Sequence, residues 1–203
     1  MRIAILGATG ATGRLLVGLA LDRGHQVTAL VRNPARLGPD RSPQLQTAMV
    51  DLTDHSAVAA ALDGSDAVVS ALGNVKGAPP GILTTGAAAV AAAGPRTVVW
   101  LGAFGTGGSA MAAGALTRRI LRLALGTEIA DKTAADDLVL AMGGTVVHAG
   151  PLTNGAAHPD PFLRSLVATP RSILPRPVSR ATVAAAMLRE AEHPQHGGQI
   201  TIP

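Results

Sequence analysis

Residues 6–14 read LGATGATGR, and this stretch decides the fold because it sets three glycines three residues apart between a strand and a helix. The apolar run at residues 3–6 precedes it, and apolar residues recur at helical spacing after it, up to Gly24. In such a unit the turn lies at the carboxyl end of the strand, where the helix N-terminus offers unpaired N–H groups and partial positive charge. The sequence therefore predicts an anion site at Gly7, Gly10 and Gly13.

The three glycines suit a pyrophosphate. Glycine permits the tight turn, lets the anion approach the backbone, and allows the helix to pack closely on the strand. The spacing is G-x-x-G-x-x-G rather than G-x-G-x-x-G. A tight turn alone needs one or two glycines and leaves the third unexplained, so dinucleotide binding is favoured.

The pattern of strand and helix repeats along the chain. Strands are predicted at residues 27–31, 47–50, 67–70, 97–101, 145–148 and 199–202, and helices near 55–62, 82–93, 116–125, 128–142 and 181–192. Strands that alternate with helices indicate a Rossmann-type doubly wound α/β fold, with a mainly parallel sheet and helices on both faces. We expect one domain over residues 1–203, with substrate-side elements from 102–127 and 150–177.

Composition limits the function classes. The 203 residues include no cysteine, so neither a disulfide nor a thiolate site is available, and we expect no metal. His193 and His196 have metal-like spacing but lie in a Pro/Gly tail, where we expect them to be solvated. The net charge is +4, and the run Arg118, Arg119, Arg122 is interpreted as a solvated helix face, since few aromatic residues are present to stack bases. We expect a soluble cytoplasmic protein that binds neither nucleic acid nor membrane, and the oligomeric state stays open between monomer and homodimer.

Arginines at two positions favour NADP over NAD. Folds that prefer NAD place an acidic residue about 20 residues beyond the glycines, whereas an arginine there suits a 2′-phosphate. Here Arg32 lies 19 residues beyond Gly13, and Arg14 follows the last glycine. Each arginine alone fits a solvated surface charge, but together they predict a preference for NADPH over NADH.

With these motifs in place, the chain resembles the atypical NAD(P)H-binding branch of the short-chain dehydrogenase/reductase superfamily, which includes NmrA-like proteins and biliverdin/flavin reductases. GATGATG resembles its phosphate loop, and Asp51 in VDLTD resembles the residue that contacts adenine in that branch. SALG resembles the segment beside the cofactor riboses, and VSRATVAAAML resembles the "SRxDVA" helix, with Thr182 at a commonly acidic position. The resemblance implies cofactor contacts from Gly7, Thr9, Gly10, Ala11, Thr12, Gly13, Arg14, Arg32, Asp51, Leu52, Ala71, Leu72, Gly73 and Lys132.

The superfamily's Tyr-x-x-x-Lys signature is incomplete. The chain has no tyrosine; Lys132 resembles the signature lysine, which puts Glu128 at the tyrosine position and Gly102 at that of the usual serine. Flavin-reductase-like members carry a histidine where this chain has Pro151, with His148 three residues earlier. The candidate catalytic residues are thus Lys132, Glu128 and His148. Glu128 also fits a surface ion pair with Lys132, and His148 fits a structural histidine.

Hydride delivered to a ketone creates an alkoxide that needs a proton donor, and the missing signature removes the usual one. A flavin, quinone or enone delocalises the charge, so we expect an NADPH-dependent oxidoreductase acting on a small hydrophobic conjugated acceptor. Phe104 is predicted to lie against the nicotinamide, or else in a surface loop. Two alternatives stay open: a non-catalytic NADP(H)-sensing NmrA-like regulator, and a non-redox isomerase or cyclase with Glu128 or His148 as base.

Overall fold

The glycine stretch forms the predicted strand, turn and helix in the computed structural model, which describes residues 1–38, 42–73, 80–110, 128–168 and 176–203. The strands are β1 (Arg2–Leu6), β2 (Gln26–Val31), β3 (Leu45–Met49), β4 (Ala67–Ser70), β5 (Val98–Ala103), β6 (Thr145–Ala149), β7 (Leu152–Thr153), β8 (Arg164–Ser165), β9 (Val178–Ser179) and β10 (Ile200–Ile202). The helices are α1 (Ala11–Asp22), α2 (His55–Leu62), α3 (Ile82–Ala93), α5 (Glu128–Ala141) and α6 (Arg180–Glu192), with short 3-10 turns η1 (Pro34–Arg36), η2 (Gly107–Ser109) and η3 (Leu166–Ala168). Strands and helices alternate as predicted as far as β6, after which the short strands β7, β8 and β9, which were not predicted, precede the last helix and strand.

The main sheet has the strand order β3-β2-β1-β4-β5-β6-β10-β8. Every neighbouring pair is parallel except β10 with β8, and β7 and β9 form a separate parallel pair. The chain adds β2 and β3 on one side of β1 and then returns to add β4 on the other. Ligands of such sheets bind at the carboxyl ends of the strands, beside this reversal.

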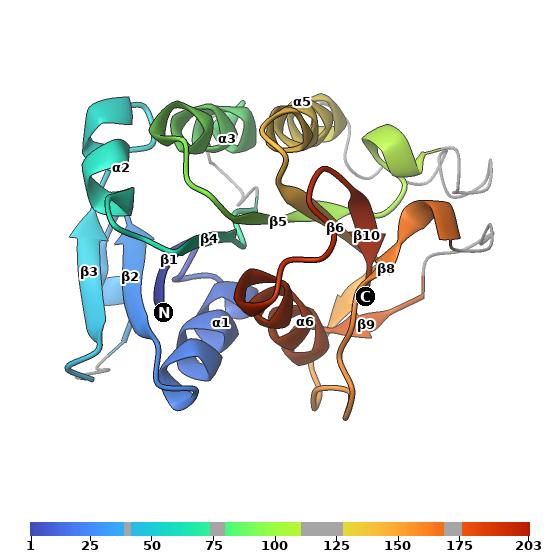
Figure 1. Cartoon of the computed structure of the whole chain (residues 1–203), viewed down its shortest axis with the longest axis horizontal. Coiled ribbons are helices and arrows are strands. Elements are labelled where there is room, and N and C mark those ends of the chain that lie inside the picture. The colour runs from blue at the N-terminus through green and yellow to red at the C-terminus, as the bar shows by residue number, and fades with distance from the viewer. Residues whose placement is uncertain (39–41, 74–79, 111–127, 169–175) are drawn as a thin grey trace.

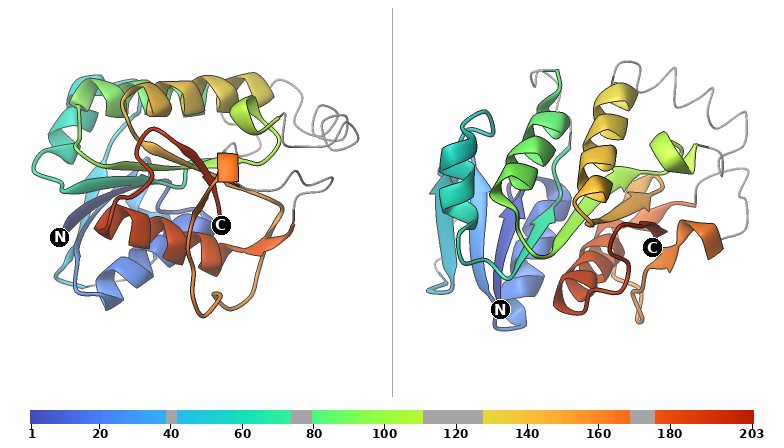
Figure 2. Two further views of the ribbon diagram at one scale, coloured as in Figure 1. Left: turned by 45° about the vertical axis from the view of Figure 1, so that its right-hand side comes forward. Right: turned by 45° about the horizontal axis from the view of Figure 1, so that its top comes forward.

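Helices cover both faces of the sheet, so the predicted Rossmann-type fold is confirmed (Figure 1). Helices α1 and α6 pack together on one face, whereas α2, α3 and α5 form a row on the other, as the turned views of Figure 2 also show. Apolar side chains alternate between the two faces along each strand. Val147 of β6 packs in the core on the α1/α6 side, and its neighbour Val146 packs in the core on the other side.

The sequence placed α2, β4 and α3 at the residues where they occur, while β3 begins two residues earlier than expected and β5 extends to Ala103. Within the segment 150–177, which the sequence predicts as part of the substrate side, β7 pairs with β9 and β8 pairs with β10. Residues 111–127 and 169–175 of the predicted substrate-side segments lie outside the described residues, and with them the helix predicted at 116–125 and the run Arg118, Arg119, Arg122. In the described part of the chain, no helix combines the length and apolarity needed to cross a membrane.

Candidate functional site

A cavity of about 550 Å³ runs along the carboxyl ends of β1, β2, β4, β5 and β6. Its wall joins the glycine loop to the ends of these strands, to α5 and to the start of α6. Eleven of the predicted cofactor residues line it: Gly7, Thr9, Gly10, Ala11, Thr12, Arg32, Leu52, Ala71, Leu72, Gly73 and Lys132. A single cavity therefore brings together five segments that lie far apart in the sequence.

The glycine loop folds tightly against the end of β4. Gly7 has a φ of +72°, and a Cβ atom there would lie 2.6 Å from the Ala71 carbonyl oxygen. A Cβ on Gly13 would lie 2.0 Å from the Gly7 carbonyl oxygen, although Gly13 itself does not line the cavity. The glycines thus allow strand, turn and helix to meet with no side chain between them.

The N-terminus of α1 is left open for an anion. Its N-cap, Gly10, has no side chain to accept the first N–H groups, and the first turn of the helix has no acidic residue. The unpaired N–H groups and the helix dipole therefore face the cavity without a protein partner that would compete with a phosphate. A loop built around glycine and ending at an uncapped helix fits a pyrophosphate.

Two arginines line the cavity beyond β2. Arg32 follows the strand directly, and Arg36 ends the turn η1, which Asn33 begins by accepting a hydrogen bond from the backbone N–H of Ala35 at 3.0 Å. The predicted contact Arg14 lies outside the lining, and its guanidinium donates to the Arg36 carbonyl oxygen at 2.7 Å. Arg14 therefore holds the turn that carries Arg36.

Asp51 also lies outside the lining, unlike its neighbour Leu52. Its Oδ1 accepts hydrogen bonds from the backbone N–H of Thr53 at 2.9 Å and from the Thr53 hydroxyl at 2.8 Å. These bonds, together with the weaker effect of the nearby Arg32, hold the pKa of Asp51 below its ordinary value of 3.8. The carboxylate therefore fixes the turn after β3 and stays ionised at neutral pH.

At the other end of the cavity, Lys132 of α5 and Arg180 of α6 line the wall with Gly102 and Ala103 of β5. Glu128 begins α5 one turn before Lys132 but does not line the cavity. Among the described residues, no ion pair within 4.0 Å joins these two side chains, so the alternative of a surface pair is not what the structure has.

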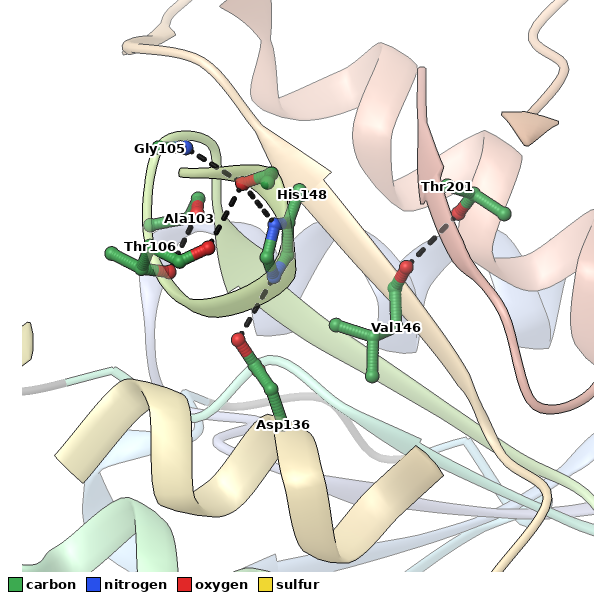
Figure 3. A network of polar contacts seen from close by, with 8 residues as sticks. Ala103, Gly105, Thr106, Asp136, Val146, His148 and Thr201 are labelled. Atoms are coloured by element: carbon green, nitrogen blue, oxygen red, sulfur yellow. Dashed lines mark hydrogen bonds and ion pairs between the residues drawn. The ribbon is translucent and has the colours of Figure 1, made fainter. Parts of the chain in front are cut away.

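His148 belongs to a buried polar network (Figure 3) and is not among the residues that line the cavity. Its Nδ1 is 2.6 Å from the Ser109 hydroxyl, and its Nε2 is 2.8 Å from the Asp136 carboxylate. The three residues are at most 2% exposed, and the Ser109 hydroxyl also accepts a hydrogen bond from the Gly105 N–H at 2.7 Å. The network ties the loop after β5 to β6 and α5.

The same network explains why residue 102 is a glycine, at the position where the superfamily usually has a serine. A Cβ on Gly102 would lie 2.6 Å from Cδ2 of His148, 2.8 Å from its Nε2 and 3.0 Å from Asp136 Oδ1. Real Cβ atoms do not approach other atoms so closely, so the imidazole and a side chain at residue 102 exclude each other. This chain has the buried histidine in place of the serine.

Restoring that serine by Gly102→Ser is expected to destabilise the protein by about 1–3 kcal/mol, because the buried His148 and Asp136 side chains must move. Equilibrium unfolding in urea measures the loss of stability, as a lower midpoint concentration with an unchanged dependence of the unfolding free energy on urea. Gly73→Ser is the matched control: Gly73 also lines the cavity, but a Cβ there meets nothing within 4 Å. Equal stability of both variants would contradict the steric account.

Phe104 does not face the cavity. It is 8% exposed, and its backbone N–H donates to the Ala149 carbonyl oxygen at 2.8 Å, which turns the loop after β5 back onto β6. The prediction of a phenyl ring against the nicotinamide therefore has no support from the structure. In the described part of the chain, no three His, Asp or Glu side chains gather as metal ligands would.

The sequence reasoning missed Arg36, Arg180 and the partners of His148. Arg180 lies within the VSRATV stretch that predicts the last helix, directly after the residue that caps that helix. Arg36 lies four residues after Arg32 in the turn NPAR, which is a recognisable turn signal. Asp136 lies one helical turn after Lys132, so the same face of α5 carries both.

A family model described as NAD(P)H-binding matches residues 7–194 of this chain. Solved structures with the same fold include ChuY, titled an anaerobillin reductase, from Escherichia coli, with a TM-score of 0.78 at 21% identity over 100% of this chain and 96% of that one. A putative NADH-flavin reductase from Streptococcus pneumoniae has a TM-score of 0.76 at 20% identity, covering 100% and 98%. At these identities the likeness shows the fold alone.

Curated relatives match over shorter stretches. A 3 beta-hydroxysteroid dehydrogenase/Delta 5→4-isomerase of Mycobacterium tuberculosis is 40% identical over 67 residues, which cover 33% of this chain and 18% of that protein. An isoflavone reductase homologue of Zea mays is 35% identical over 83 residues, covering 37% and 27%. The match therefore spans less than a third of the length of either relative.

Proposed function

This chain belongs to the NAD(P)H-binding family, as its resemblance to the atypical branch implied, and we propose that it is an NADPH-dependent oxidoreductase acting on a small conjugated acceptor. The observation that carries the proposal is the single cavity that joins the uncapped glycine loop and Arg32 to Lys132. A nicotinamide cofactor bound there would supply the hydride. The chain's residues would bind and orient it.

The preference for NADPH rests on the charges around Arg32. Arg32 and Arg36 both line the cavity, and the lining, which consists only of described residues, contains no Asp or Glu to accept from a ribose 2′-hydroxyl. Two guanidinium groups with no carboxylate beside them in the wall suit a 2′-phosphate. A preference for NADH would be favoured by a carboxylate at this position that accepts hydrogen bonds from the ribose hydroxyls.

The acceptor class follows from the absence of a proton donor in the wall. The ionisable side chains of the lining are all cations, namely Arg32, Arg36, Lys132 and Arg180. The wall, which consists of described residues, has no His, Asp or Glu side chain to serve as a general acid. A flavin, quinone or enone delocalises the negative charge that hydride transfer brings and can take its proton from water. For such an acceptor, the protein needs only to position it against the nicotinamide.

The test is to follow NADPH oxidation at 340 nm with a panel of flavins, quinones and enones, with Gly13→Ala as the variant expected to lose turnover. Consumption of NADPH with at least one acceptor is the expected result. Inertness towards the whole panel, together with intact NADPH binding, would overturn the proposal in favour of the regulator. Product formed without reduced cofactor would indicate an isomerase.

The non-catalytic NADP(H)-sensing alternative is favoured by one specific observation: the serine and tyrosine positions of the signature hold Gly102 and Glu128, and Glu128 lies outside the wall. Such a sensor would discriminate NADP+ from NADPH without turnover and would retain a partner protein in a pull-down. The isomerase alternative has less support, because its proposed bases, Glu128 and His148, both lie outside the lining.

A further inference from the structure

We propose that the acceptor carries an acidic group, a carboxylate or a phosphate, and that Arg180 binds this group with help from the charge of Lys132. The proposal rests on the proposed function, since it names the acceptor class of the same cavity. It changes the expectation drawn from the sequence, which pointed only to a hydrophobic acceptor.

The two cations reach the cavity from opposite faces of the sheet. Lys132 lies on α5, in the row of helices on one face, whereas Arg180 is the first residue of α6, which packs beside α1 on the other face (Figure 1). The same wall includes Gly102, Ala103 and Ala149, at the ends of the neighbouring strands β5 and β6.

Neither charge is neutralised by the described protein. The Arg180 guanidinium donates to the Asn154 side-chain carbonyl at 2.9 Å, a neutral partner, and no ion pair within the described residues includes Arg180 or Lys132. Arg180 also begins a 13-residue helix whose first turn has no acidic residue, so its charge adds to the positive end of the helix dipole. The half-buried Arg180 guanidinium is therefore oriented by a neutral amide and is not paired with a described carboxylate.

The phosphate groups of the cofactor do not account for these charges. The loop at Gly7 and Gly10 with the start of α1 suits the pyrophosphate, and Arg32 and Arg36 suit the 2′-phosphate, at the β2 side of the cavity. Lys132 and Arg180 line the part formed by β5, β6 and α6, beyond the reversal of strand order. An anion at that end belongs to the second ligand, and a bidentate guanidinium suits carboxylate or phosphate equally.

Matched pairs of acceptors test the proposal by equilibrium binding. Riboflavin and flavin mononucleotide differ by one phosphate, and 1,4-naphthoquinone and its 2-sulfonate differ by one acidic group. Binding is measured by fluorescence quenching on protein saturated with NADP+, so that the glycine loop is occupied. We expect the anionic member of at least one pair to bind about tenfold more tightly, as one charge-assisted contact would give.

Arg180→Gln is expected to remove this difference by weakening the anionic ligand alone, while Kd for NADP+ stays unchanged. Arg164→Gln is the control, because Arg164 is an exposed arginine that stacks on the Phe162 ring at 4.6 Å and does not line the cavity. Equal affinities within both pairs would overturn the proposal, as would an anion preference that survives Arg180→Gln. A variant that loses NADP+ affinity would instead assign Arg180 to the cofactor.

The same titrations separate this proposal from the proposed function. Protein that fails to bind NADP+ yet keeps an anion preference dependent on Arg180 would overturn NADP binding and support the acid site. Protein that binds NADP+ but shows no preference for the anionic acceptors would support NADP binding and overturn the proposed role of Arg180.

Discussion

Gly13→Ala is expected to weaken NADPH binding by about 100-fold or more, because a backbone anion site that moves by an ångström loses its alignment. The new methyl group would lie 2.0 Å from the Gly7 carbonyl oxygen and 2.9 Å from the Ala8 Cα, both backbone atoms of the loop. No side-chain rotation relieves such a contact, so the turn itself must shift away from α1. Fluorescence titration measures the affinity, and thermal unfolding shows that the variant is folded.

Gly18→Ala is the matched control on the same helix. Gly18 lies in α1, and a Cβ there meets nothing within 4 Å. Alanine at that position should leave NADPH affinity unchanged and stabilise the protein by about 0.5–1 kcal/mol, because glycine is the poorer helix former. If Gly13→Ala also bound NADPH normally, the close packing of loop and helix would not be what forms the site.

Arg32→Ala is expected to lower NADPH affinity by about 10- to 100-fold, the effect of removing a charged hydrogen bond to phosphate, and to leave NADH affinity nearly unchanged. The reason is that Arg32 lines the cavity at the end of β2, where the described wall contains no carboxylate. Isothermal titration of both cofactors with wild type and variant gives the ratio of affinities. Arg96→Ala is the control, since Arg96 is an exposed arginine that precedes the amino end of β5 and does not line the cavity.

The outcome that would rule out this role is a parallel loss of affinity for NADH and NADPH, because Arg32 would then act on the shared part of the cofactor. The pH dependence gives a second check. A phosphate monoester takes up its second proton near pH 6, so NADPH affinity should decrease as the pH falls through about 6, whereas NADH affinity should not.

The fold could be predicted because its signals are local. The strands β1, β2, β4, β5 and β6 contain apolar runs of parallel-sheet type, whereas the edge strand β3 is the more polar LQTAM, and the helices between the strands end at glycine or near polar residues. The short strands β8 and β9 could not be predicted, because each is two residues long and forms by pairing, β8 with β10 and β9 with β7. Such short strands have no pattern of their own before the chain has folded.

The glycine loop and Arg32 could be predicted for the same reason, since each lies within a few residues of a strand end. The roles of His148 and Phe104 could not. The side chain of His148 points to the α5 side, where Asp136 and Ser109 surround it, and these partners are 12 and 39 residues away in sequence. Arg180 reaches the cavity only because α6 packs beside α1, a long-range contact that the periodicity of the helix does not encode.

The central claim is that the glycine loop and Arg32 together bind NADPH. The most direct test is to titrate the purified wild-type protein with NADPH and with NADH and to follow the nicotinamide fluorescence. The account predicts saturable binding of both, with NADPH at least about tenfold tighter, the equivalent of one charged contact. Equal or tighter binding of NADH would contradict the role of Arg32, and no binding of either cofactor would contradict the claim itself.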